Sequence, residues 1–100
     1  MLLQAQIILN KDEMDDQGHP LYLTILQWMV QQHLPSARVL EGISGIGQQR
    51  IIHPGALFSF DEPPILILFE AEAERVRHAL REIRQFSPTA LMLAYEVELF

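Results

Sequence analysis

The sequence has no cysteine among its 100 residues, and its basic residues are few. Without thiols, disulfide bonds and thiolate metal or nucleophile sites are excluded. Seven lysines and arginines against thirteen acidic residues give a net charge of −6. A nucleic-acid-binding protein needs a basic surface that neutralises phosphates, so this balance argues against a nucleic-acid partner.

Long apolar runs are also missing, because no stretch approaches the roughly 18 apolar residues of a membrane span. We therefore expect neither a targeting signal nor stable membrane insertion, and we predict a cytoplasmic protein. Hydrophobic residues make up 49% of the chain and charged residues 20%. A single domain over residues 1–100 with that composition has more apolar surface than a monomer of this size can easily hide, which predicts self-association.

Hydrophobic periodicity predicts six elements. Apolar residues alternate along strands at 3–9, 38–44 and 91–99, a continuous apolar stretch marks a strand at 65–69, and helical spacing marks helices at 20–34 and 72–86. Pro20 is expected at the first helical position. The order strand, helix, strand, strand, helix, strand is that of an α+β, ferredoxin-like βαββαβ sandwich, with a four-stranded antiparallel sheet and two helices on one face.

The other face of this sheet is expected to be bare. The strand at 65–69 is apolar at every position, which predicts a central strand buried on both faces. Ile8, Met92 and Ala94 are expected to join it on the bare face. We therefore predict that subunits pack sheet to sheet around a three-fold axis, as a homotrimer.

The stretch from Ala37 to His53 asks for an explanation beyond packing. Apolar and polar residues alternate along its first half, and Gly42, Gly45 and Gly47 then remove side chains where strand pairing should stop. Such a segment lets a ligand approach the backbone closely. The structural alternative is a twisted strand end with bulges, which isolated glycines in strands usually mark.

Known nucleotide and catalytic motifs do not match this chain. The spacing Gly-x-x-Gly-x-Gly differs from the dinucleotide fingerprint, and no phosphate-binding Gly-Lys-Ser or Gly-Lys-Thr occurs. No serine lies in a nucleophile elbow, and the carboxylate pairs Asp15–Asp16 and Asp61–Glu62 fall in expected turns, where solvation explains them. The acidic loop 10–18 also lacks the ligand spacing of a calcium loop. We therefore predict a protein that is not an enzyme and has no catalytic residue.

Four histidines leave a metal site as an alternative, with His33, His53 or His78 as its ligands. They lack the His-x-x-x-His and Glu-x-x-His pairs that place two ligands on one face of a helix, so a structural or surface role is the simpler interpretation. No metal ligand is therefore assigned.

Three short motifs follow one another along this chain. They are Pro20-Leu21-Tyr22 at the start of the first helix, Ala37-x-Val39-x-x-Gly42-Ile43-x-Gly45-Ile46-Gly47 in the glycine segment, and Ile52-His53 after it. In these motifs the chain resembles the small PII-like bacterial proteins of domain-of-unknown-function family one-ninety. The resemblance covers nearly the whole chain.

That resemblance implies a fold similar to the PII signalling proteins, which are trimers that bind adenine nucleotides in clefts between subunits. Those proteins relay the bound state to a partner through a long loop after the second strand. The resemblance therefore implies a non-catalytic regulatory or sensor module, with ATP, ADP or AMP as bound effector and a regulated partner such as a transporter or an enzyme. A related copper-tolerance family of the same fold implies the alternative, a metal-binding trimer.

Two grounds give the expected ligand-binding residues, the glycine segment and the resemblance to PII proteins. Gln49 matches the glutamine that in PII proteins helps organise the nucleotide's metal and a bound oxo-acid. PII proteins hold phosphates on a basic, glycine-rich loop after the second helix. Residues 85–89 occupy that position in this chain and do not form such a loop. The expected phosphate partners are therefore Arg38, Arg50 and Arg84. The expected site comprises Arg38, Gly42, Gly45, Gly47, Gln49, Arg50, His53 and Arg84.

Overall fold

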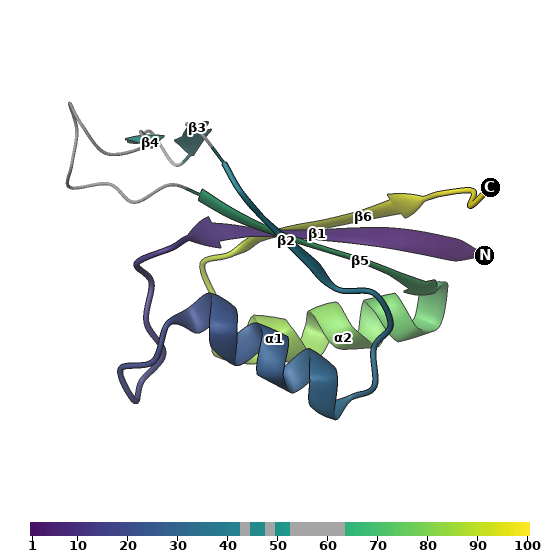
Figure 1. The fold of residues 1–100 in the computed structure, drawn as a ribbon, viewed down its shortest axis with the longest axis horizontal. Helices are drawn as coiled ribbons and strands as arrows, with labels where there is room; N and C mark the ends of the chain where they lie inside the picture. The colour runs from purple at the N-terminus through teal and green to yellow at the C-terminus, as the bar shows by residue number, and fades with distance from the viewer. Residues whose placement is uncertain (43–44, 48–49, 53–63) are drawn as a thin grey trace.

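Two helices lie against one face of a four-stranded antiparallel sheet (Figure 1), in a computed structural model that describes residues 1–42, 45–47, 50–52 and 64–100. The strand order is β2-β5-β1-β6. The strands are β1 (Leu2–Asn10), β2 (Arg38–Glu41), β5 (Pro64–Glu72) and β6 (Leu91–Glu96), and the helices are α1 (Leu21–Gln31) and α2 (Ala73–Phe86). The predicted ferredoxin-like βαββαβ fold is confirmed.

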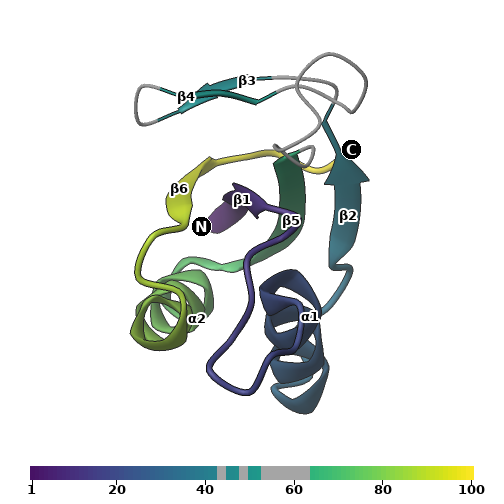
Figure 2. The ribbon, with the colours of Figure 1, turned by 90° about the vertical axis from the view of Figure 1, so that its left-hand side faces the viewer.

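The core lies between the sheet and the helices. Viewed end-on, α1 lies beneath the β2 side of the sheet and α2 beneath the β6 side (Figure 2). Every second residue of β1 and β5 points to the helices, and each helix contributes one apolar stripe. The buried residues of these elements include Leu3, Ala5, Ile7, Leu9, Leu21, Ile25, Met29, Ile65, Ile67, Phe69, Val76, Ala79 and Ile83.

The strand predicted to be buried on both faces is central but is buried on only one. On β5, Ile65, Ile67 and Phe69 are buried against the helices, whereas Leu66 and Leu68 on the other side are half-buried. Within one chain the helices cover one face of β5, and no described residue covers the other, so burial of the second side stays a prediction for an assembly of several copies. We call this uncovered side the open face.

The face that β6 turns to the helices also differs from the prediction. Ile7 of β1 pairs with Met92, and Ala5 pairs with Ala94. Because residues directly opposite in an antiparallel pair share a face, Met92 and Ala94 point to the helix side, and their expected place on the open face is wrong. Ile8 does lie on the open face. The central residues of the open face are Arg38, Leu40, Leu66, Leu68, Glu70, Gln4, Gln6, Ile8, Leu91, Leu93 and Tyr95.

The ends of α1 are set by backbone conformation. Pro20 has φ −56° and ψ 125°, which is extended, so it precedes the first helical residue instead of occupying it as predicted. The helix ends at Gln31, slightly before the predicted 33–34, and His33 has the left-handed φ of 58°. Arg75 of α2 donates to the carbonyls of Gln32 at 3.0 Å and His33 at 2.5 Å, which satisfies acceptors at this helix end.

The glycine segment contains a second, two-stranded sheet. β2 ends at Glu41, and β3 (Gly45–Gly47) pairs antiparallel with β4 (Arg50–Ile52). The prediction that strand pairing stops at the glycines is therefore wrong for Gly45 and Gly47. Glycine keeps its backbone donor and acceptor, and two residues between strands are enough for a hairpin.

Arg84 satisfies the turn that follows α2. Its Nη1 donates to the carbonyls of Ser87 at 3.2 Å, Pro88 at 2.8 Å and Ala90 at 2.8 Å. These carbonyls belong to the turn beyond Phe86, and a cation near a helix C-terminus is favourable. Arg84 therefore has a structural role that its position in the sequence does not reveal.

We expect Arg84→Met to destabilise the protein by about 1.5–3 kcal/mol, because hydrogen bonds from a charged donor contribute on that scale. Denaturant unfolding measures this difference. Arg81→Met, at an exposed position of the same helix, is the matched control and should change the unfolding free energy by less than about 0.5 kcal/mol. Equal effects of the two substitutions would contradict the role of Arg84 in holding this turn.

Candidate functional site

The glycine segment leaves the sheet at a tightly fixed root. The last β2–β5 pair is Glu41 with Ile65, and just beyond it the Gly42 N–H donates to the Pro64 carbonyl at 2.7 Å. A Cβ added to Gly42 would lie 2.6 Å from Pro64 Cγ, closer than real Cβ atoms approach other heavy atoms. Glycine is therefore required at position 42, because Pro64 lies too close for a side chain. The contact joins β2 to β5 at the point where segment 43–63 leaves the sheet.

An ion pair joins this root to the loop after β1. Lys11 Nζ lies 2.9 Å from Glu41 Oε1, with both side chains partly exposed. In addition, Asn10 at the end of β1 pairs with Pro64. Three stretches of chain therefore meet at the root, the ends of β1 and β2 and the start of β5.

Some of the expected site residues in the glycine segment belong to the described structure and others do not. Gly45, Gly47 and Arg50 lie on the β3–β4 hairpin, where Gly47 and Arg50 form a strand pair. Gln49 and His53 lie outside the described residues. The hairpin thus brings two of the glycines and one of the expected arginines together, on the segment that begins at the root.

Arg38 lies on the open face and is engaged in a hydrogen-bonded row. Its Nη1 donates to Glu70 Oε1 at 3.0 Å and to the Ser36 carbonyl at 2.9 Å, and its Nη2 also contacts the Glu70 carboxylate. Gln4 donates to Glu70 Oε2 at 2.7 Å. The Arg38 guanidinium, and to a lesser degree Gln4, holds the pKa of the Glu70 carboxyl below its ordinary range.

The row continues across the remaining strands. The Tyr95 hydroxyl donates to Gln4 Oε1, and Gln6 Nε2 donates to the Tyr95 hydroxyl at 2.9 Å. Gln4 lies directly opposite both Glu70 and Tyr95 in the two strand pairs, so one side chain can bond to both. We call Arg38, Glu70, Gln4, Tyr95 and Gln6 the polar row. The sequence marks each as polar, but only the register of four strands shows that they meet.

The third expected arginine, Arg84, is bonded to the turn after α2. Helix α2 lies against the covered face of the sheet (Figure 1). The described structure therefore does not bring Arg38 and Arg84 together around one ligand, since one lies on each side of the sheet. A shared site would need the open face of one copy and the helix end of another.

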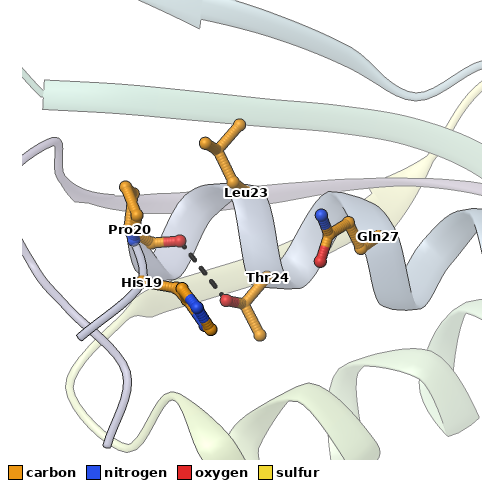
Figure 3. Close-up of a pocket in the computed structure, with 5 residues that line it drawn as sticks. All are labelled: His19, Pro20, Leu23, Thr24 and Gln27. Carbon is orange, nitrogen blue, oxygen red and sulfur yellow. Dashed lines mark hydrogen bonds between the residues drawn. The ribbon is translucent and has the colours of Figure 1, made fainter. Parts of the chain in front are cut away.

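A shallow hollow of about 170 Å³ lies at the start of α1 (Figure 3), lined by His19, Pro20, Leu23, Thr24 and Gln27. Among its lining residues, the Thr24 hydroxyl donates to the Pro20 carbonyl at 3.4 Å, and Asp15 beside the hollow binds two of the lining residues. The Asp15 carboxylate accepts from the N–H groups of His19 at 2.8 Å and Gln17 at 2.9 Å, and from the Thr24 hydroxyl at 2.8 Å. These bonds, led by that of His19, lower the pKa of Asp15.

Asp15 therefore organises the acidic loop, which the sequence had indicated only as a solvated turn. A sequence signal was present, because Asp commonly accepts from backbone N–H groups just before a helix.

The described histidines do not lie together. His19, His33 and His78 have exposed positions on three different segments, and His53 lies outside the described residues. Within residues 1–42, 45–47, 50–52 and 64–100, no three metal-binding side chains gather at one point. In that same part of the chain, neither α1 nor α2 has the length and apolar character needed to cross a bilayer.

The fixed root predicts the outcome of Gly42→Ala. The added Cβ would force Pro64 or β2 to move, which should destabilise the protein by about 1–3 kcal/mol, the usual cost of overpacking. Denaturant unfolding of Gly42→Ala, Pro64→Ala and the double variant separates the contact from other effects. The cost of Gly42→Ala should shrink when Pro64 Cγ is absent. A cost that is unchanged in the Pro64→Ala background would place its origin elsewhere.

The Glu70 ion pair predicts a dependence of stability on pH. Because the pKa of Glu70 is lowered on folding, its contribution is complete above the pKa of the unfolded chain and is lost as the pH falls through the lower, folded-state pKa. Glu70→Gln should remove this part of the acid destabilisation, which urea unfolding across the acidic range measures. Asp15 acts in the same direction and persists in the variant.

The control for this variant is Glu98→Gln, which removes an exposed carboxylate outside the polar row. If Glu70→Gln and Glu98→Gln give the same pH profile, the Arg38–Glu70 pair does not contribute to stability.

Three comparisons relate the chain to known proteins. No curated protein matches its sequence. CPII, a nitrogen regulatory PII-like protein from Thiomonas intermedia K12 whose structure holds ADP, AMP and bicarbonate, aligns with a TM-score of 0.74 and 15% identity over 98% of this chain and 87% of its own. The divalent ion tolerance protein CutA1 from Ehrlichia chaffeensis aligns with a TM-score of 0.64 and 10% identity over 99% of this chain and 83% of its own.

At these identities the two structural relatives show a common fold. The sequence places the chain in a family. The model of the family DUF190, described as an uncharacterized ACR, matches residues 4–99. The match includes the root at Gly42, the β3–β4 hairpin and the polar row. The chain therefore belongs to the DUF190 family and has a PII-like fold.

Proposed function

We propose that this protein is a non-catalytic PII-like regulatory module, a homotrimer that binds a small anionic ligand at clefts between subunits and signals to a protein partner. The ligand we propose is an adenine nucleotide. The observation that carries the proposal is the glycine hairpin, which begins at the Gly42–Pro64 root of a PII-like sheet. A protein of this fold, CPII, is bound to ADP, AMP and bicarbonate, which supports the ligand class.

The trimer is supported by the open face. Leu40, Leu91, Leu93 and Tyr95 on this face are each more than a third exposed. A domain of 100 residues that leaves such residues uncovered gains stability by burying them against another copy. An assembly of this kind also supplies a second chain for a ligand cleft.

Among the expected arginines, Arg50 is the one we assign to the ligand phosphates. Arg38 is paired with Glu70, and Arg84 is bonded to three carbonyls, so both would have to give up existing contacts. Arg50 lies on the hairpin opposite Gly47, and a glycine has no side chain of its own to keep an anion from its backbone N–H. Gly45, Gln49 and His53 complete the proposed ligand-binding segment.

The alternative is a metal-binding trimer. The likeness to a divalent ion tolerance protein supports it at the level of fold. Its ligands would come from His33, His53 and His78, with different copies contributing to one site. The same binding experiment distinguishes the two functions.

Thermal melting of the purified protein against ATP, ADP, AMP, bicarbonate and divalent metals tests the proposal. A ligand at a hundred times its dissociation constant stabilises by about 2.7 kcal/mol, which raises the melting temperature by several degrees. Arg50→Ala should weaken nucleotide binding by about 1.5–3 kcal/mol, the contribution of a charge-assisted contact, with little effect on the unliganded melt.

Arg81→Ala is the matched control and should bind as the unmodified protein does. A stabilisation by zinc or copper alone, lost in His53→Ala, would favour the metal-binding alternative. Melting curves that no nucleotide moves would contradict the proposed ligand class.

A further inference from the structure

We propose that the polar row fixes the register in which copies of this chain pack their open faces together. The inference rests on the self-assembly proposed above and adds a role for Arg38, Glu70, Gln4, Tyr95 and Gln6. The row supplies specificity for one arrangement, while the leucines beside it supply most of the attraction.

The row is a continuous band across the sheet. Arg38 is on β2, Glu70 on β5, Gln4 and Gln6 on β1, and Tyr95 on β6, so all four strands contribute. Each member bonds to at least one other through its side chain. The Glu70 side chain is only 12% exposed even though no described residue covers this face. Because its two charged members, Arg38 and Glu70, are already paired with each other, the row can be covered by another chain without leaving a charge unpartnered.

Large apolar side chains lie beside this band, toward the pair of Ile8 with Leu66. Leu91, Leu40 and Leu93 are 58%, 52% and 38% exposed on the same face. The pairing of β6 with β1 directs Leu91 and Leu93 away from the helices and directs Met92 and Ala94 toward them. The more strongly apolar side of β6 is thus the uncovered one, which is the arrangement expected for a surface that becomes buried.

Charge favours a second copy as the occupant. The chain carries a net charge of −6, so two copies repel one another over most of their surfaces. The charged residues at the centre of the open face are Arg38 and Glu70, and they form an ion pair. A strongly acidic or basic partner would find no unpaired charge there, whereas another copy can approach without like-charge repulsion.

Apolar contact alone would leave the register loosely specified. Hydrophobic attraction is non-directional, and leucines repeat along neighbouring strands, so sheets could pack in several offsets with similar area buried. An offset that places the polar row of one copy against the leucines of another removes the row from water without offering it new partners. Buried polar side chains select register and oligomeric state in this way in other assemblies, at some expense of affinity.

The test replaces Gln4, which links Glu70 to Tyr95, by an apolar residue of similar length. Native mass spectrometry of the full chain is compared for the unmodified protein, Gln4→Met and Leu66→Met, the last being a change on the same face outside the row. We expect one stoichiometry for the unmodified protein and Leu66→Met, and at least two for Gln4→Met. Tyr95→Phe, which deletes one hydroxyl and keeps the ring, should shift the distribution in the same direction.

Circular dichroism verifies that every variant is folded. If Gln4→Met and Tyr95→Phe assemble with the same single stoichiometry as a trimeric unmodified protein, the role of the polar row is wrong while the proposed trimer stands. If the unmodified protein is a monomer, both the trimer and the role of the row are wrong. A homogeneous dimer whose stoichiometry becomes mixed in Gln4→Met would support the row and contradict the trimer.

Discussion

The structure depends on one constraint, which is that two helices cover one face of a four-stranded sheet. Both helices lie on the same side, so the core forms there, between alternate residues of β1 and β5 and one stripe from each helix. The open face is the unavoidable consequence. Its leucines and its polar row are the features that most need an explanation outside the single chain, and assembly of several copies provides one.

Much of this fold could be predicted from the sequence, because burial follows local period. Leu3, Ala5, Ile7 and Leu9 alternate in the sequence and are buried in the structure. For β6 the local period was insufficient, since both of its sides contain apolar residues. Only the pairing of Ile7 with Met92, a contact between distant parts of the chain, decides which side faces the helices. The end of β2 and the return of pairing at Gly45 also depend on strand partners.

The candidate site was less predictable for the same reason. Residue type indicates that Arg38 and Arg84 can bind anions, but it does not show that Glu70 and the carbonyls after α2 already occupy them. Gly42 was singled out because it lacks a side chain. The physical cause is Pro64, which is remote in sequence and adjacent in space. A root held by this contact and by the Lys11–Glu41 pair gives the glycine hairpin a defined origin.

Sedimentation equilibrium of the unmodified protein, at several concentrations and without added ligand, tests the central claim most directly. The claim is that the open face is buried between copies of the chain. We predict a mass three times the 11.5 kDa of one chain, stable on dilution through the micromolar range. A mass of 11.5 kDa throughout would contradict it, because the leucines and the polar row would then face solvent in the working protein.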